Sequence, residues 1–128
     1  MCIIDFTESS NSAIGWAILM CQQLRAHLCI LHTYRLLPSK TGELTNWKKN
    51  REEEAQQKFN ILEKQHLIGK GLSYEFKMEI GFVADRLEEY AKYNNLDFII
   101  MDNKTDFSGY ETFHALFNHL PAPILLIP

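Results

Sequence analysis

The sequence lacks the features that mark several large classes of protein. Its 128 residues include three cysteines, an odd number with no Cys-x-x-Cys pair, which argues against a disulfide framework and favours reduced thiols in a cytoplasmic protein. No apolar run approaches the roughly 18–20 residues that span a membrane. The opening stretch MCIIDFTESS has no basic region ahead of an apolar one, so it does not resemble a signal peptide.

Clustered positive charge is absent as well. The formal net charge is −3 and the isoelectric point is about 5.9, which argues against a nucleic-acid partner because such proteins carry a basic face. The chain is not depleted in apolar residues, and its 46% hydrophobic content argues against intrinsic disorder. Its length is typical of a single domain, which we expect to span residues 1–128.

Short apolar runs alternate with segments of helical periodicity along the whole chain. The predicted strands are Met1–Ile4, Leu28–Thr33, Leu72–Ile80, Leu96–Met101 and Ala122–Ile127. The predicted helices cover roughly residues 10–25, 44–65, 82–93 and 110–119. This alternation predicts an α/β fold, a doubly wound parallel sheet with helices on both faces. Ligands of such sheets bind at the carboxyl ends of the strands, where the strand order reverses.

Other proteins with this architecture carry motifs that this chain does not have. A phosphoacceptor receiver domain needs an acidic pair after the first strand, but Asp5 has no acidic neighbour. The third predicted strand ends at Gly81 without an aspartate, and the last one holds no lysine. Neither a Gly-x-Gly-x-x-Gly turn nor a Gly-Lys-Ser/Thr sequence occurs, which argues against dinucleotide-binding and P-loop sites.

The histidines do not form a convincing metal site. His27 and His32 are an odd number of residues apart on one predicted strand, so their side chains point to opposite faces. Glu111 and His114 have a spacing compatible with metal binding on a helix, but a second such pair is missing, and a solvated helix face is the better interpretation. We therefore expect no metal.

A catalytic nucleophile is also not indicated. Cys21 and Cys29 have no basic neighbour in the sequence and are interpreted as small buried apolar residues. Ser9 and Ser10 are interpreted as helix caps. Because no set of nucleophile, base and orienting group is apparent, we expect that the protein is not an enzyme.

Several stretches in this order resemble the universal stress protein family over nearly the whole chain. They are Asp5-Phe6-Thr7-Glu8-Ser9-Ser10, Leu31-His32-Thr33-Tyr34, Asp97-Phe98-Ile99-Ile100-Met101 and Ala122-Pro123-Ile124-Leu125-Leu126-Ile127-Pro128. The first resembles the family's Asp-Phe-Ser after strand one, and the last resembles its Cys-Pro-Val-Leu ending. The resemblance implies a five-stranded parallel sheet of order 3-2-1-4-5, like that of the adenine nucleotide alpha hydrolases, and a homodimer.

One subgroup of this family binds ATP through glycines after strand four, and this sequence departs from that pattern. Asp102 and Thr105 stand at the first two glycine positions, and the closing Gly-Ser pair is missing. Glycines let the backbone approach phosphates, whereas Asp102 and Asp106 add negative charge that only Lys104 offsets. Two unit charges about 4 Å apart interact by roughly 4 kcal/mol at an effective dielectric constant near 20, so we expect the triphosphate to be excluded.

The same resemblance places Asp5, Thr33 and Met101 at positions that line the adenosine part of the ligand. For these residues a purely structural role, as turn, sheet and core residues, is the alternative interpretation. The ligand set that the resemblance implies is therefore Asp5, Thr33, Met101, Asp102 and Lys104.

The predicted function is that of a non-catalytic, stress-response universal stress protein domain without ATP or another cofactor. It would act by dimerisation or by binding a protein partner or small ligand, with no nucleic acid or membrane partner. The predicted dimer edge is the last strand, Ile124, Leu125, Leu126 and Ile127, because an exposed apolar edge needs a covering strand. The alternative is an adenine-nucleotide-binding protein, a weak ATPase or an AMP/ATP sensor, with a remodelled phosphate loop. A pyrophosphatase-like relative is less favoured, because residues 7–12 contain no glycine.

Overall fold

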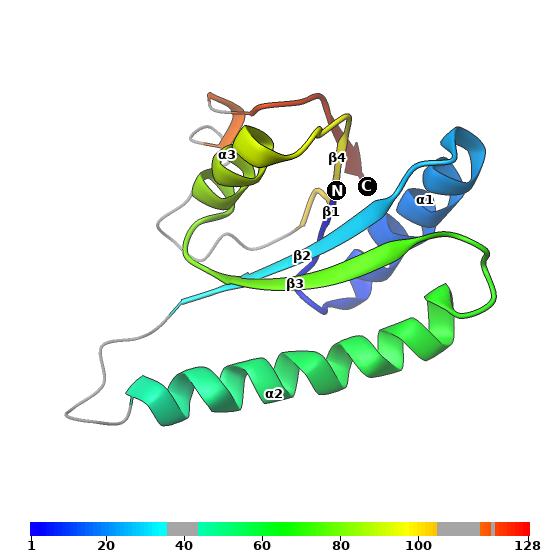
Figure 1. Cartoon of the computed structure of the whole chain (residues 1–128). Coiled ribbons are helices and arrows are strands. Elements are labelled where there is room, and N and C mark those ends of the chain that lie inside the picture. Colours follow the sequence, from blue (N-terminus) through cyan, green and yellow to red (C-terminus); the bar gives the residue numbers. More distant parts are fainter. Residues whose placement is uncertain (36–43, 105–115, 119) are drawn as a thin grey trace.

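A computed structural model of the chain describes residues 1–35, 44–104, 116–118 and 120–128 (Figure 1). The described strands form one five-stranded sheet of order β3-β2-β1-β4-β5, and every pair of neighbours is parallel. The strands are β1 (Cys2–Ile3), β2 (Leu28–Tyr34), β3 (Tyr74–Ile80), β4 (Ile99–Asp102) and β5 (Ile124–Ile127). The helices are α1 (Glu8–Leu24), α2 (Leu44–Leu62) and α3 (Val83–Tyr93). The predicted fold class and strand order are confirmed.

The helices cover the two faces of the sheet in a way that the chain direction explains. From β1 to β3 the chain moves toward one edge, and right-handed crossovers then place α1 and α2 on one face. It returns across the sheet to β4, which places α3 on the opposite face (Figure 1). The sheet is thus the middle layer of three, as expected for strands buried on both faces.

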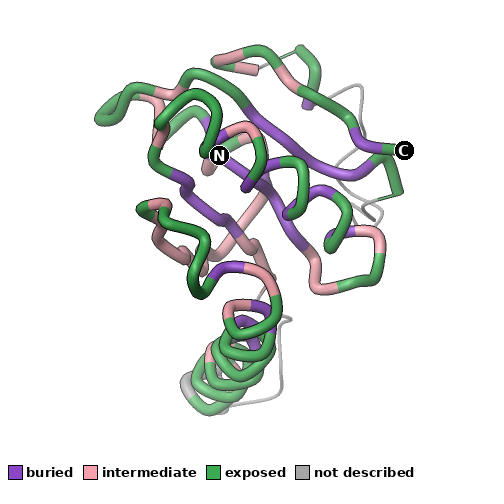
Figure 2. The backbone as a smooth tube through the Cα atoms, turned by 90° about the vertical axis from the view of Figure 1, so that its right-hand side faces the viewer, coloured by how far each residue is buried: buried purple, intermediate pink, exposed green. Residues whose placement is uncertain are grey.

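Each face has its own apolar core, because successive side chains of a strand point to opposite faces. On the α1 and α2 side, Ile30 and Ile100 pack with Ile14 and Phe59. On the α3 side, Leu31 and Met101 belong to the cluster that contains Val83 and Leu87. Figure 2 shows the buried segments in the central strands and the inner sides of the helices, whereas most of α2 is exposed. At about 25 cal/mol per Å² of apolar surface, each buried branched side chain contributes about 1.5–3 kcal/mol.

Several predicted boundaries differ from the observed ones. The run beginning at Leu96 was expected to be a buried strand, but β4 starts only at Ile99, and Phe98 is exposed. The second helix ends at Leu62 and continues as a π-helical turn over Glu63–Leu67. The helix predicted at 110–119 lies mostly outside the described residues. β3 is an edge strand of the sheet.

The two edges of the sheet differ in length and charge. β3 pairs with β2 over seven residues, and its side chains alternate between charged and apolar groups. β5 pairs with β4 over four residues, and Leu125 and Leu126 are 38% and 36% exposed. The β5 edge is therefore the more apolar one. In the part of the chain that the structure describes, no helix is long and apolar enough to cross a membrane.

Candidate functional site: the carboxyl ends of β1 and β4

The strand order reverses between β1 and β4, and three of the predicted ligand residues, Asp5, Asp102 and Lys104, lie where these strands end. Cys2 of β1 pairs with Ile100 of β4, so the chain leaves these neighbouring strands at Asp5 and just after Asp102. Parallel α/β sheets bind ligands in the crevice at this kind of reversal. The structure therefore brings the turns of Asp5 and Asp102 to the carboxyl-terminal end of the sheet.

Asp5 is half-buried and accepts hydrogen bonds from the start of α1. Its Oδ1 accepts the Thr7 amide at 3.0 Å and the hydroxyls of Thr7 and Ser10 at 2.5 Å each. Ser10 Oγ accepts the Asp5 amide at 3.1 Å in return. Burial alone would raise the pKa of the Asp5 carboxyl, but the hydrogen bonds from Ser10 and Thr7 outweigh it and hold this pKa below its ordinary value. Asp5 is thus held as a carboxylate.

The predicted capping role of Ser9 and Ser10 is wrong. Helix α1 begins at Glu8 with Thr7 as its N-cap, and Thr7 makes no side-chain cap hydrogen bond. Its hydroxyl bonds to Asp5 instead. The completely buried Ser10 lies in the first turn of the helix and closes the hydrogen-bonded ring with Asp5. The physical reason is that both hydroxyls donate to the ionised Asp5 carboxylate, in charge-assisted hydrogen bonds that are stronger than the bonds they would accept from helix amides as caps.

Between Asp5 and Thr7, the backbone of Phe6 has a positive φ of 63°. A residue with a Cβ atom adopts this left-handed conformation at a cost of roughly 1–2 kcal/mol. The centroid of the Phe6 ring lies 4.8 Å from that of His32 and 6.0 Å from that of Phe76. This packing of the rings offsets the conformational cost. Backbone strain of this kind is often found at functional sites.

Asp102 closes the turn after β4 with its own side chain. It is only 1% exposed, and its Oδ1 accepts the backbone amide of Lys104 at 2.8 Å. Aspartate commonly stabilises turns by bonding to the amide two residues on. The amide of Asn103 bonds to the Ile127 carbonyl at 2.9 Å, so β5 also engages this turn. The described amides of the turn therefore already have acceptors within the protein, while the Lys104 side chain is exposed.

Thr33 and Met101 lie on the α3 side of the sheet. Thr33 is half-buried near the end of β2, where it pairs with Glu79 of β3. Met101 is completely buried in the α3-side core. Met101 therefore has no open surface for a ligand in this arrangement. Residues 105–109, where the sequence also departs from the glycine pattern of the ATP-binding subgroup, lie outside the described residues.

His32 lies on the opposite face of the sheet, toward α2. Its Nδ1 is 3.1 Å from the carbonyl oxygen of Ile4, and this contact orients the ring. Burial lowers the pKa of His32, and the neighbouring Lys58 and Arg51 lower it further, although the Ile4 contact and Asp5 act in the other direction. His32 is thus mainly neutral at pH 7. A cavity of about 140 Å³ separates it from α2. Sequence analysis did not identify His32 as a site residue.

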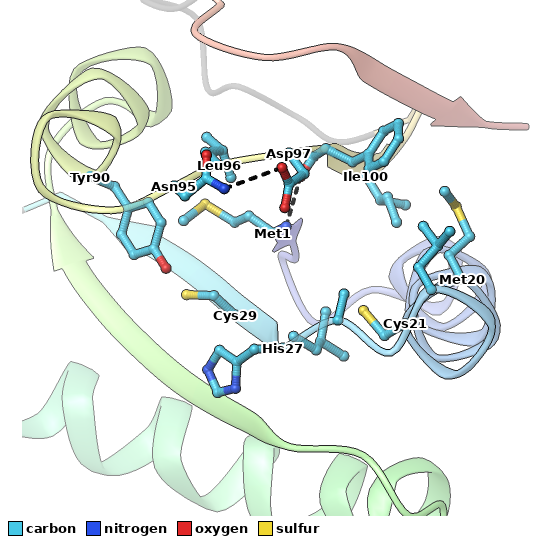
Figure 3. Close-up of a pocket in the computed structure, with 14 residues that line it drawn as sticks. Met1, Met20, Cys21, His27, Cys29, Tyr90, Asn95, Leu96, Asp97 and Ile100 are labelled. Carbon is cyan, nitrogen blue, oxygen red and sulfur yellow. Dashed lines mark hydrogen bonds between the residues drawn. The ribbon is translucent and has the colours of Figure 1, made fainter.

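The other candidate groups occupy the amino-terminal end of the sheet. Cys21 and Cys29 line a small cavity there (Figure 3). Burial raises the pKa of both thiols, that of Cys29 to about 11, so neither is a thiolate at neutral pH. This agrees with the interpretation of both as buried apolar residues.

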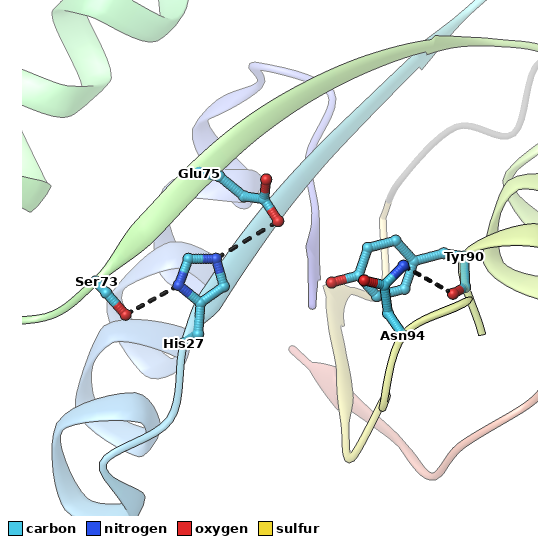
Figure 4. A network of polar contacts seen from close by, with 5 residues as sticks. All are labelled: His27, Ser73, Glu75, Tyr90 and Asn94. Carbon is cyan, nitrogen blue, oxygen red and sulfur yellow. Dashed lines mark hydrogen bonds and ion pairs between the residues drawn. The ribbon is translucent and has the colours of Figure 1, made fainter. Parts of the chain in front are cut away.

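His27 precedes β2 rather than lying within it, which corrects the prediction that both histidines share one strand. Its ring lies between Ser73 Oγ, at 2.9 Å from Nδ1, and Glu75 Oε1, at 3.5 Å from Nε2 (Figure 4). A serine, a histidine and a carboxylate in this order could in principle activate the Ser73 hydroxyl as a nucleophile. The His27 side chain is 48% exposed, however, so water reaches the group and weakens the electrostatic stabilisation that such catalysis needs. Among the described residues, no three histidine, cysteine, aspartate or glutamate side chains could hold a metal ion.

Comparisons with known proteins agree with this architecture. Universal stress protein UspA from Lactobacillus plantarum is 16% identical, with a TM-score of 0.78, and the match covers 100% of this chain and 97% of that one. A universal stress protein family member from Burkholderia pseudomallei is 18% identical, with a TM-score of 0.73, over 99% of this chain and 95% of that one. A universal stress protein solved in complex with cAMP is 16% identical, with a TM-score of 0.61, over 99% and 95%.

Comparison with curated proteins gives no significant sequence match. The profile of the Universal stress protein family, however, matches residues 1–128. The chain belongs to the universal stress protein family.

Proposed function

We propose that this chain is a non-catalytic universal stress protein domain that excludes the triphosphate of ATP and acts in the cytoplasm by dimerisation or by binding a partner. The observation that carries this proposal is the turn after β4. There the buried Asp102 carboxylate already accepts the Lys104 amide, at 2.8 Å. A phosphate needs such amides as donors, so it would compete with a carboxylate held in place by the fold.

Charge acts in the same direction as geometry. A phosphate near Asp102 would face a like charge, and at about 4 Å the repulsion is roughly 4 kcal/mol at an effective dielectric constant near 20. The exposed Lys104 ammonium offsets this only in part, because water and salt screen it. The energetic balance therefore disfavours a polyphosphate at this turn.

Titration calorimetry with Mg-ATP tests the proposal. We expect no binding tighter than about 10 μM, which corresponds to roughly −7 kcal/mol. The variant Lys104→Ala should give the same result, because its side chain holds no phosphate. Binding tighter than this limit that weakens in Lys104→Ala would contradict the proposal.

The proposed dimer uses the free edge of β5. Leu125 and Leu126 are partly exposed on this short edge strand, whose outer backbone groups lack a neighbouring strand among the described residues. A second copy related by a two-fold axis would cover both the apolar side chains and these backbone groups. The opposite edge, β3, carries Glu75, Lys77 and Glu79, which discourage such pairing.

Analytical ultracentrifugation of the Leu125→Lys variant tests this interface. At micromolar concentration we expect the unmodified chain to be a dimer and Leu125→Lys to be a monomer. Ile68→Lys is the matched control, because Ile68 is an exposed apolar residue outside the strands. An unmodified chain that sediments as a monomer would refute the dimer.

The second candidate function is binding of an adenine nucleotide without a triphosphate cradle. Asp5, which the family resemblance places beside adenosine, is held as a carboxylate at an open strand end. A universal stress protein of similar fold has been solved with cAMP, which carries one phosphate instead of three. Titration with cAMP discriminates: binding tighter than about 10 μM that is lost in Asp5→Ala would favour this second function.

A further inference from the structure

The cavity between the strand ends and α2 has features of a ligand site, and apart from Asp5 neither the sequence motifs nor the proposed function uses its lining residues. It has a volume of about 140 Å³ and lies at the carboxyl ends of β1 and β2, on the α2 side of the sheet. An apolar cavity of about 150 Å³ is large enough for benzene, which has six heavy atoms, so a ligand of phosphate size fits this one. Its lining is mostly polar and includes Asp5, His32, Tyr34, Arg51, Glu54 and Lys58.

One face of α2 supplies the charged wall. Arg51, Glu54, Ala55 and Lys58 have the 3–4 residue spacing of a single helix face, and the small, buried Ala55 leaves the space open. Lys58 Nζ pairs with Glu54 Oε1 at 3.0 Å. Arg51 lies over the Trp47 ring, 4.7 Å from its centroid, and makes no ion pair with a described carboxylate. Its guanidinium is therefore available to an anion.

The opposite wall is the oriented His32 ring. Because Nδ1 is within hydrogen-bond distance of the Ile4 carbonyl, the neutral ring carries its proton on Nδ1 and leaves Nε2 as an acceptor. No other hydrogen bond of His32 occurs within the described part of the chain. The negative charge of Asp5 is engaged by Thr7 and Ser10, and that of Glu54 by Lys58. The cavity thus offers the guanidinium of Arg51, unpaired among the described residues, on one wall, beside Lys58 with its partner Glu54, and one acceptor on the other wall.

We propose that this cavity binds a phosphate group, as the free ion or as a small phosphate monoester. Phosphate fits because its oxygens can accept from the Arg51 and Lys58 donors while its remaining hydroxyl donates to His32 Nε2. A phosphate monoester, with a second pKa near 6, retains this hydroxyl in part of the population at neutral pH, and the free ion always keeps at least one, whereas a carboxylate is fully ionised. Arginine favours phosphate further, because its planar fork can form two parallel hydrogen bonds.

This inference does not rest on the exclusion of ATP proposed above. The family's ATP pattern concerns the turn after β4 and the α3-side residues Thr33 and Met101. Of the predicted ligand residues, only Asp5 also lines this cavity, whose cationic wall comes from α2. A failure to bind ATP leaves the phosphate proposal standing. The absence of phosphate binding would likewise leave the exclusion of triphosphate at the β4 turn standing.

The experiment is an NMR titration of the full chain at pH 6.5, with inorganic phosphate in one arm and glycerol phosphate in the other. We expect saturable shifts of the His32 ring signals, and an affinity about tenfold weaker in Arg51→Gln, as for the loss of a charged hydrogen-bond donor. Glu54→Gln should bind about two- to fivefold more tightly, because a repelling carboxylate is removed. Binding of both probes indicates a site for the free ion, and binding of glycerol phosphate alone a site for the ester.

The control pair comes from the same helix. Lys49 and Glu53 form an exposed ion pair, with 3.8 Å between Nζ and Oε1, and neither lines the cavity. Lys49→Gln and Glu53→Gln carry the same charge changes as the test variants and should leave the phosphate affinity unchanged. Equal weakening by Lys49→Gln and Arg51→Gln would indicate a diffuse charge effect and overturn the site.

A second readout follows the His32 pKa. The charged groups around its ring are Asp5 from the turn after β1, and Arg51, Glu54 and Lys58 from α2. A bound phosphate adds a negative charge, so the His32 pKa should rise on saturation, and it should rise less in Arg51→Gln. An unchanged pKa, equal binding of acetate, or shifts confined to Asp102–Lys104 would each overturn the proposal.

Discussion

The turns that follow β1 and β4 lie at the same carboxyl-terminal end of the sheet, and both contain an aspartate. The two aspartates differ in burial and in their hydrogen-bond partners. Asp5 is half-buried, and two hydroxyls and an amide from the first residues of α1 hold it as a carboxylate. Asp102 is 1% exposed and bonds to the amide of its own turn. The first aspartate retains access to solvent, whereas the second is buried and already accepts an amide of its turn. The same residue type thus has different hydrogen-bond partners in the two turns.

Removing the buried hydroxyl from the first turn should have the largest effect. Ser10→Ala removes one donor from the Asp5 carboxylate and the acceptor of the Asp5 amide, so we expect a loss of about 1–3 kcal/mol of unfolding free energy. Urea denaturation measures this loss. Ser9→Ala is the control, because within the described part of the chain the Ser9 hydroxyl bonds only to the exposed Thr7 hydroxyl, and it should stay within about 0.5 kcal/mol. Equal losses in the two variants would mean that Ser10 does not support Asp5.

The second turn should tolerate the loss of charge better than the loss of the acceptor. Asp102→Asn keeps an oxygen for the Lys104 amide, whereas Asp102→Ala leaves that amide without it. We expect Asp102→Ala to lower the unfolding free energy by about 0.5–1.5 kcal/mol more than Asp102→Asn does. Denaturation curves of the two variants, measured side by side, check this difference. If Asn is as damaging as Ala, the charge rather than the hydrogen bond stabilises the turn.

The third and smallest expected effect is the contribution of Asp5 to the loss of stability at acidic pH. Its pKa is lower in the folded than in the unfolded chain, where a value near 3.9 is expected, so the unfolded state takes up the proton first. The stabilisation by Asp5 is therefore complete above about pH 4 and is lost as the pH falls through the lower folded pKa. Thermal denaturation between pH 5 and 2.5 should show a shallower acid decline in Asp5→Asn. An identical decline would show that the hydrogen bonds do not lower this pKa.

Much of the fold followed from local patterns in the sequence. Continuous apolar runs such as residues 28–31 indicate strands buried on both faces, and the observed β2 confirms this. The strand order itself was inferred from the family resemblance rather than from local patterns. The boundary at Leu96 was missed because Phe98, although apolar, lies before the sheet and remains exposed. An apolar side chain does not by itself reveal whether it is buried.

The details of the site were less accessible from the sequence. Ser10 resembled a helix cap, and only the left-handed backbone of Phe6 turns the chain so that Ser10 meets Asp5. The spacing of Arg51 and Lys58 can be read from the sequence, but on a helix rich in charged residues it is also typical of a solvated face. His32 became relevant only when the fold placed it opposite α2, because the contact joins segments far apart in the sequence.

The most direct test of the central claim follows the backbone amide of Lys104 by NMR while Mg-ATP is added. The account predicts that this amide stays bonded to Asp102, so its signal does not move as Mg-ATP is raised to about 1 mM, a concentration a hundredfold above the 10 μM limit. A saturable shift of the Lys104 amide with a Kd below about 10 μM would show that the triphosphate replaces Asp102 as its acceptor, and would contradict the account.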